Sequence, residues 1–152
     1  LYNHPKVKAM VCLTKGEGFG RPLLEFSITG KPIIASRWSG HVDFLNEEFT
    51  LLIGGTLTPV HKSAVVKDTI LEEGKWFTPD DSEVAAAYKN IHSKYKKYIE
   101  LGKRQAYFVK SNFTLQHMNE VLDKVLDDNL PVFPKQTELN LPNLTIPKLK
   151  LK

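Results

Sequence analysis

Two glutamates with seven residues between them are the side chains of this sequence best suited to chemistry. They open and close the segment EGFGRPLLE, residues 17–25, with Glu17 in a glycine-rich stretch and Glu25 in a predicted first helical turn. A carboxylate accepts two hydrogen bonds from neighbouring hydroxyls of a sugar. Glycines let a ligand come close to backbone N–H groups, and free N–H groups attract phosphate. The segment therefore predicts a site for a phosphorylated sugar.

The backbone around this segment is predicted to pass from a strand into a short helix. The apolar residues 7–13 indicate a buried strand, Pro22 favours a first helical turn, and Gly30 followed by Pro32 favours a helix end. The positive end of the predicted helix, residues 22–29, then points toward the glycine-rich loop. Pro22 has no N–H group to donate. The predicted donors to a phosphate are the amides of Phe19, Gly20, Arg21 and Leu23.

Each glutamate taken alone has an ordinary explanation. Glu25 in a first helical turn is favourable beside the helix dipole whatever its function, and Glu17 is equally compatible with a solvated loop residue. A dinucleotide site is disfavoured, because Gly16, Gly18 and Gly20 lack the G-x-G-x-x-G spacing. The neighbouring sequence decides between a sugar-phosphate site and these ordinary explanations.

The run TKGEGFGRPLLEFSITGKPIIASRWSGHVDFL, residues 14–45, follows the predicted strand. It combines an E-x7-E pair, G-F-G inside that pair, an aromatic residue after the second glutamate, G-x-P-I-I-A-S and a turn of small residues. In these features it closely resembles the nucleotide-binding half of retaining glycosyltransferases of the GT-B fold, the group related to sucrose synthase, glycogen synthase and mannosyltransferases. Lys15, Gly16 and Ser27 depart from the residues common in that family, which leaves the sugar unassigned.

The resemblance implies a role for each residue of the motif. Glu17 is expected to be the catalytic residue beside the donor sugar, and Glu25 to hold the ribose hydroxyls of the nucleotide. The expected reaction is transfer of a hexose, with retention, from a UDP- or GDP-sugar, without a metal or other cofactor and with electrostatic support of the departing diphosphate. The remaining donor-binding residues are Lys15, Gly18, Phe19, Gly20, Arg21 and Leu23.

His41 follows Ser39 and Gly40 at a predicted helix start. Relatives have a glycine-rich turn there that faces the active-site cleft, so the resemblance makes His41 a candidate contact with donor or acceptor. The other explanation is a simple helix-start residue. No pair of histidines has the spacing of a metal site, and none is predicted.

The resemblance covers residues 1–126 and begins late. Relatives carry, ahead of this point, further strands with a basic residue that grips the pyrophosphate, and a whole acceptor domain. The chain opens with Leu1 and shows no signal sequence, so we expect a fragment or processed piece that carries half of a site. We expect no sugar transfer by this chain without an acceptor domain or a neighbouring chain. The alternative function is a non-catalytic binding or interaction module that keeps the fold.

The order of elements predicts an α/β fold with a Rossmann-like parallel sheet and flanking helices, part of a GT-B C-terminal domain. Two further strands are predicted at residues 31–36 and 49–53. Residues 56–81 are expected to be an irregular insertion with one helical turn near residues 65–71. The last predicted helices are residues 83–99, continuing to 109 after a break near Gly102, and residues 115–126. The nucleotide-sugar domain then spans residues 1–128.

Composition narrows the class of protein. The chain has 152 residues, 41% of them hydrophobic, which suits one modest core, and no apolar run is long enough to span a membrane. The net charge of +4 comes largely from lysines on a predicted helix, where a solvated face is favoured over a phosphate-binding stripe, so no nucleic-acid partner is expected. Tyrosines at helical spacing among them, Tyr88, Tyr95 and Tyr98, are predicted to face the core.

The single cysteine, Cys12, is predicted to be a buried thiol, because it lies in the first strand. One cysteine excludes an intrachain disulfide, which favours a reducing compartment and a cytoplasmic location. Residues 129–152 form a tail rich in Pro, Leu and Lys, predicted to be extended and to be ordered only along another surface, such as a neighbouring copy in a homo-oligomer. A disordered end is the alternative.

Overall fold

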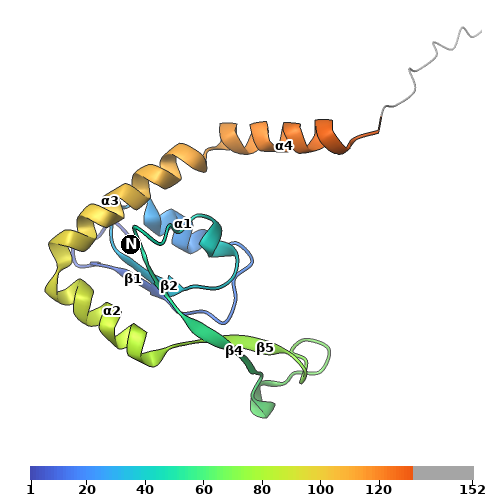
Figure 1. Ribbon diagram of the computed structural model, residues 1–152, viewed down its shortest axis with the longest axis horizontal. Coiled ribbons are helices and arrows are strands. Elements are labelled where there is room, and N and C mark those ends of the chain that lie inside the picture. Colours follow the sequence, from blue (N-terminus) through green and yellow to red (C-terminus); the bar gives the residue numbers. More distant parts are fainter. Residues whose placement is uncertain (132–152) are drawn as a thin grey trace, which may run out of the picture.

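Strand β2 (Ile33–Ser36) is buried along its whole length and forms the centre of the sheet in a computed structural model that describes residues 1–131. It pairs in parallel with β1 (Met10–Cys12) on one side and with β3 (Leu51–Ile53) on the other (Figure 1). Ile34 stands opposite Val11 and Leu51 in this register. The predicted α/β class with a parallel sheet and flanking helices is confirmed, with strands shorter than the apolar runs.

The alternating side chains of the sheet enter two separate clusters. α1 (Arg21–Ser27) covers one face, and α2 (Asp81–Ser93) covers the other. Both faces of a parallel sheet are normally covered in this way. The cluster under α1 consists of Leu23, Phe26, Ile33, Ala35, Phe44, Leu45 and Leu52. The cluster under α2 consists of Ile34, Ile53, Ala87 and Ile91.

Helix α3 (Tyr95–Asn112) follows α2 after one residue and crosses the end of α1 (Figure 1). The predicted break near Gly102 is wrong, because the helix is interrupted at Lys94 and continues through Gly102. Gly102 is buried against the loop after α1, where an added Cβ would lie 2.5 Å from the carbonyl oxygen of Gly30. The glycine therefore marks a close backbone approach and not a helix break.

Two sequence expectations about burial need correction. Tyr95 and Tyr98 pack against the cluster under α2, but Tyr88 is 50% exposed and does not face the core. The Tyr95 hydroxyl donates a hydrogen bond to the carbonyl oxygen of Lys8 at 3.0 Å. Cys12 is half-buried at the carboxyl end of an edge strand, because β1 has a neighbour on one side only.

Residues 56–81 are irregular only between two paired strands. The turn predicted near residues 65–71 is a single hydrogen-bonded turn, in which the Ile70 amide donates to the Val66 carbonyl oxygen at 2.8 Å, and no helix forms there. β4 (Gly55–Pro59) and β5 (Lys75–Pro79) form an antiparallel pair, with Leu57 opposite Phe77. A short 3₁₀ helix, η2 (Lys62–Ala64), lies within the connection between them. Both strands end in a proline, Pro59 and Pro79, which the edge of a two-stranded ribbon tolerates.

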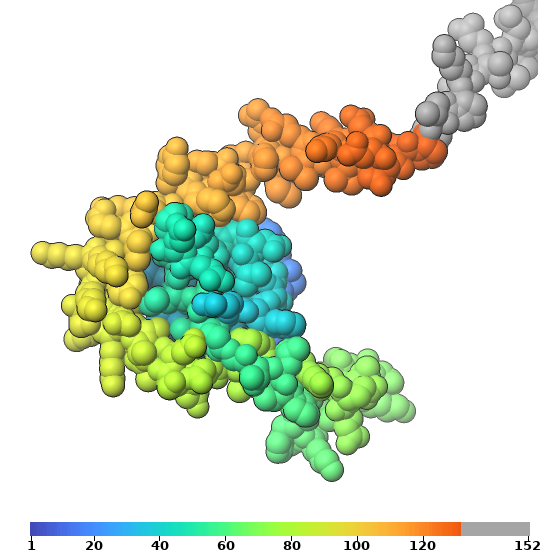
Figure 2. All heavy atoms as spheres, viewed as in Figure 1, coloured from blue at the N-terminus to red at the C-terminus, as the bar shows by residue number. Residues whose placement is uncertain are grey.

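Helix α4 (Leu115–Asn129) agrees with the predicted position but does not close the domain. None of its residues is buried, and it projects from the body as an arm in Figure 2. No helix among residues 1–131 is long and apolar enough to cross a membrane. The expectations for the tail concern residues 132–152 and lie outside the described part of the chain.

The contact at Gly102 generates a stability prediction. Gly102→Ala normally improves an exposed helix by about 1 kcal/mol, but here the added methyl group meets backbone atoms that cannot rotate away. We expect a loss of about 1–3 kcal/mol in the free energy of unfolding, measured by urea denaturation. Gly18→Ala is the control, because its added Cβ has no other atom within 4 Å. Equal stabilities of the two variants would contradict this packing.

Candidate functional site

Three chain connections meet beyond the carboxyl end of the parallel sheet. The loop after β1 contacts the loop after β2 through Glu17 and Ser39. It also contacts the β4–β5 hairpin, because the amide of Phe77 donates to the carbonyl oxygen of Lys15 at 3.3 Å. The hairpin also contacts the loop after β2, because the ring of Phe77 stacks on the ring of Trp38. Ligands of open α/β sheets bind at this end of the strands, and the predicted motif lies there.

Ser39 fixes the backbone of Glu17 from both sides. The Glu17 amide donates to Ser39 Oγ at 2.9 Å, and Ser39 Oγ donates to the Glu17 carbonyl oxygen at 2.5 Å. The Gly40 amide donates to the same carbonyl oxygen at 3.0 Å. Both backbone polar groups of the first glutamate are therefore satisfied by one neighbouring turn, which sets the direction of its side chain.

The turn that holds Glu17 is strained. Ser39 has φ 83° and ψ −172°, a conformation adopted almost only by glycine. Gly40 beside it has no room for a side chain, since an added Cβ would lie 2.0 Å from the Gly18 carbonyl oxygen. Backbone strain of this kind costs about 1–3 kcal/mol and persists where surrounding contacts determine it. Sequence reasoning missed Ser39, although its place in a turn of small residues was visible.

The glycine loop leaves a row of backbone donors free. Gly20 is left-handed, with φ 82°, and begins α1 without a side-chain cap. The amides of Gly18, Phe19 and Gly20 donate to no acceptor within residues 1–131. The Leu23 amide, predicted as a further donor, is already bonded to the Gly20 carbonyl oxygen at 2.9 Å, and its side chain is buried. Of the four predicted donors, the amides of Phe19, Gly20 and Arg21 therefore have no acceptor within residues 1–131, and that of Leu23 is occupied. Gly18 adds a free amide that was not among the predicted donors.

The two glutamates have different surroundings. Glu25 is exposed on α1 and forms an ion pair with Arg21, whose Nε lies 2.8 Å from Glu25 Oε1. Such an exposed pair contributes little to stability, so both side chains are available to a ligand. Glu17 is half-buried beside Cys12. Burial raises the pKa of the Cys12 thiol above its ordinary 9.0, and the Glu17 carboxylate raises this pKa further.

His41 lies under the loop and not in an open cleft. Its ring is fully buried, and Nε2 donates to the carbonyl oxygen of Ser36 at 2.6 Å. Its Cβ packs against Gly20, where an added Cβ would approach within 2.9 Å. The loop therefore covers the ring in this structure, and a contact between His41 and a ligand stays a prediction. His41 lies on η1 (Gly40–Asp43), so the expected helix start there is a 3₁₀ turn.

Two buried polar atoms at this end of the sheet lack a hydrogen-bond partner among the described residues: His41 Nδ1 and Thr14 Oγ1. Most buried polar side-chain atoms in folded proteins are hydrogen-bonded. The unpaired atoms flank the segment that carries Glu17. Unsatisfied groups are therefore concentrated beside the predicted site.

Aromatic side chains form one border of the site. The rings of Trp38 and Phe77 stack with centroids 6.0 Å apart and planes 2° apart, and Trp38 remains 42% exposed. Lys15 Nζ lies 6.0 Å from the centre of the Trp76 ring. Sequence reasoning placed Lys15 at the site but missed this border, because the hairpin that carries Trp76 and Phe77 was not predicted.

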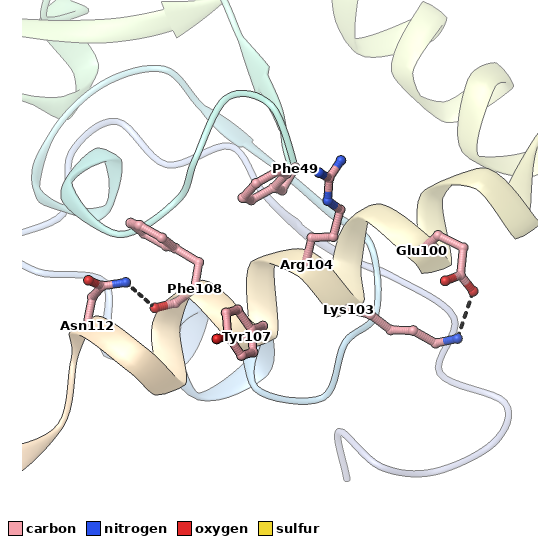
Figure 3. A pocket seen from close by; sticks show the side chains of 7 residues that line it. All are labelled: Phe49, Glu100, Lys103, Arg104, Tyr107, Phe108 and Asn112. Atoms are coloured by element: carbon pink, nitrogen blue, oxygen red, sulfur yellow. Dashed lines mark hydrogen bonds and ion pairs between the residues drawn. The ribbon is translucent and has the colours of Figure 1, made fainter.

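The described residues offer no ready metal site, since no group of three or more His, Cys, Asp or Glu side chains within 1–131 could hold a metal ion. A hollow of about 480 Å³ lies elsewhere, between α3 and Phe49 (Figure 3). Its lining contains none of the residues of the predicted motif. The candidate site is the set of joined loops and not this hollow, because the loops hold the strained backbone and the free donors.

The backbone strain at Ser39 predicts different stabilities for two variants of this residue. Ser39→Ala keeps the strained backbone and removes both Oγ hydrogen bonds, so we expect a loss of about 1–3 kcal/mol in the free energy of unfolding. Ser39→Gly removes the same bonds but releases the strain, and we expect it to be more stable than Ser39→Ala by about 1–2 kcal/mol, after the entropy cost of glycine. Urea denaturation of both proteins measures the difference. An alanine variant as stable as the glycine variant contradicts the strain.

The raised pKa of Cys12 gives a second prediction. The thiolate is the reactive form of a cysteine. The rate of alkylation by iodoacetamide is therefore expected to rise with pH around a midpoint above 9.0, the ordinary pKa of the thiol. Glu17→Gln removes the carboxylate's contribution and is expected to shift the rate profile to lower pH. Glu72→Gln, an exposed carboxylate on the hairpin, is the control and is expected to leave the profile in place. An unchanged profile for Glu17→Gln means that its carboxylate does not lie near the thiol.

Comparison of the chain with models of known families, with curated proteins and with solved structures gave no match.

Proposed function

We propose that this chain binds the donor nucleotide sugar of a retaining GT-B glycosyltransferase. The observation that carries the proposal is the row of free amides at Gly18, Phe19 and Gly20, placed between two glutamates beyond the carboxyl end of a parallel sheet. Free amides suit a diphosphate, and carboxylates suit the hydroxyls of a sugar or a ribose. The resemblance of residues 14–45 to the nucleotide-binding half of these enzymes supports the same assignment.

The two glutamates are proposed to bind different parts of the donor. Glu25 lies on the exposed side of α1, where Arg21 pairs with it, and takes the ribose hydroxyls. Glu17 is half-buried in the glycine-rich loop, with its backbone fixed by Ser39, and takes the transferred hexose. The diphosphate then spans the free amides between them. Lys15 and Arg21 are the cations nearest in the sequence to these amides, and they offset the negative charge of the diphosphate.

Trp38 is proposed to add an apolar surface for the donor. Its ring is stacked on Phe77, which fixes its orientation, and its free side remains accessible. Ligand sites are commonly lined by aromatic side chains with a few polar groups that fix the orientation of the ligand. The ring is suited to a nucleobase or to the apolar side of a sugar.

Donor binding and sugar transfer are separate steps, and the first is what we propose for this chain alone. Rate enhancement in transfer depends on positioning and on exclusion of water. The proposed site lies in joined surface loops, with Phe19 46% and Trp38 42% exposed, so it does not surround a reacting centre. This openness also favours the alternative function, a binding module that keeps the fold without catalysis.

Binding of donor candidates to two glutamate variants tests the proposal. A thermal-shift screen with UDP, GDP, ADP and their sugars first identifies the base, and calorimetry then compares Glu17→Ala and Glu25→Ala. Loss of hydrogen bonds to a charged acceptor is expected to weaken binding by about 1.5–3 kcal/mol. We expect Glu25→Ala to weaken both the nucleotide and its sugar conjugate, and Glu17→Ala to weaken the conjugate alone.

Glu72→Ala is the matched control, because its carboxylate is exposed in the connection between β4 and β5 and forms no hydrogen bond or ion pair with the described residues of the motif. Its affinity is expected to equal that of the parent chain. If both motif variants bind the nucleotide sugar as the parent does, the assignment of the two carboxylates is wrong. If no nucleotide or nucleotide sugar shifts the melting temperature, donor binding by this chain is wrong.

A further inference from the structure

Helix α4 carries an apolar face that no described part of the chain covers. The six side chains of this face recur three or four residues apart along the helix, as expected for one packed side. Each is between 41% and 79% exposed. They are Leu115, Met118, Val121, Leu122, Val125 and Leu126. A face of this size on a surface helix normally packs against another element.

The junction between α3 and α4 holds α4 away from the body of the same chain. Phe113 anchors the junction, with its ring centre 6.0 Å from that of Phe44 and 6.2 Å from that of Phe108. Thr114 then caps α4 by accepting a hydrogen bond from the His117 amide at 3.1 Å. With both ends of the junction fixed, α4 extends outward and does not fold back onto α3 (Figures 1 and 2).

The outer side of α3 offers a groove of matching character. Figure 3 shows its first part, the hollow of about 480 Å³, with Phe49, Phe108 and Tyr107 around it. Arg104 lies over the Phe49 ring, at 5.1 Å from its centre. A second hollow of about 290 Å³ lies on the other side of Tyr107 and shares Lys103 with the first. Tyr107 itself is 76% exposed between the two hollows.

The two helices are complementary in charge. α3 carries five lysines or arginines and one glutamate, whereas α4 carries four aspartates or glutamates and one lysine. Lys103, Arg104 and Lys110 line the groove together with Glu100, which pairs with Lys103 at 2.7 Å, so the lining keeps a positive net charge. On α4, Asp128 follows Val125 by three residues and so borders the apolar face. An acidic border beside a basic groove favours one docking orientation over others.

The lengths of the two partners also agree. α4 has 15 residues and is about 22 Å long at 1.5 Å per residue. The part of α3 that lines the two hollows, residues 100–112, is about 20 Å long on the same basis. The groove therefore accommodates nearly the whole apolar face of such a helix.

We propose that the groove on α3 binds α4 of a second copy of this chain, and that the exchange is reciprocal in a two-fold dimer. Each chain contributes one helix and one groove, so the contact closes on itself and leaves no further groove open. Burial of the six apolar side chains provides the driving force, and the groove cations set the orientation. This dimer involves α3 and α4 and does not depend on the proposed donor site.

The oligomeric state of the full chain and of two variants tests the exchange. Sedimentation equilibrium is expected to show a dimer for the parent chain, weakened by added salt. Leu122→Asp alters the face of α4, and Tyr107→Asp alters the groove; both side chains are exposed, so folding is expected to persist and is checked by circular dichroism. Each change is expected to raise the dimer dissociation constant about tenfold or more, as for loss of an anchor side chain. Tyr88→Asp, at an exposed tyrosine on α2, is expected to leave it unchanged.

Mixing the two variants distinguishes exchange from other dimers. The Leu122→Asp chain keeps its groove, and the Tyr107→Asp chain keeps its α4. A heterodimer of the two therefore has one contact in which both the groove and the helix are unaltered, and it is expected to form more readily than a dimer of either variant alone. A monomeric parent chain overturns the proposal. Dimerisation of Tyr107→Asp at the parent's strength also overturns it, because α4 then pairs with something other than the groove.

Discussion

The shape of the proposed site depends on one contact, the hydroxyl of Ser39 against the backbone of Glu17. A glycine-rich loop has many accessible conformations, and its own sequence does not select one of them. The selection comes from the turn after β2, which satisfies both backbone groups of Glu17. That turn can approach so closely because Gly40 has no side chain. The loop after β1 and the loop after β2 thus fix each other's conformation.

The strain in this turn and the unpaired buried atoms beside it have the same origin. The carboxyl end of a parallel sheet brings backbone segments together without strands to pair them, so their polar groups must be satisfied individually. His41 Nε2 and Ser36 Oγ meet carbonyl oxygens there, while His41 Nδ1 and Thr14 Oγ1 meet none among the described residues. Local departures from ideal packing of this kind are typical of functional sites.

The main architecture was predictable from the sequence because each buried strand is a short apolar run and each turn has its own residues. The parallel sheet, the loop that carries Glu17 and the helix that carries Glu25 follow from this local information. The hairpin of β4 and β5 was not predictable in the same way, since its strands mix threonine, proline and tryptophan and pair mainly with each other. The aromatic border of the site was missed with it.

Other differences depend on tertiary contacts that no local pattern contains. Gly102 resembles a helix break in the sequence, but it is the point where two backbones touch. Ser39 resembles an ordinary turn residue, and only its dihedral angles show that it occupies a conformation suited to glycine. His41 occupies the position expected from the motif, yet the packing against Gly20 places its ring beneath the loop.

Gln105 shows how α3 is kept in register with the rest of the domain. Its side-chain amide donates to the carbonyl oxygen of Phe44 at 2.6 Å and accepts from the amide of Asn46 at 3.0 Å, and it is almost fully buried. These partners lie 61 and 59 positions earlier in the chain, so the bridge forms only after a long segment has closed. A slide of α3 by one residue would bury an unpaired amide and two unpaired backbone groups at once. These two hydrogen bonds therefore select the correct register of α3 late in folding. A misaligned helix that apolar packing alone would tolerate loses them and is less stable.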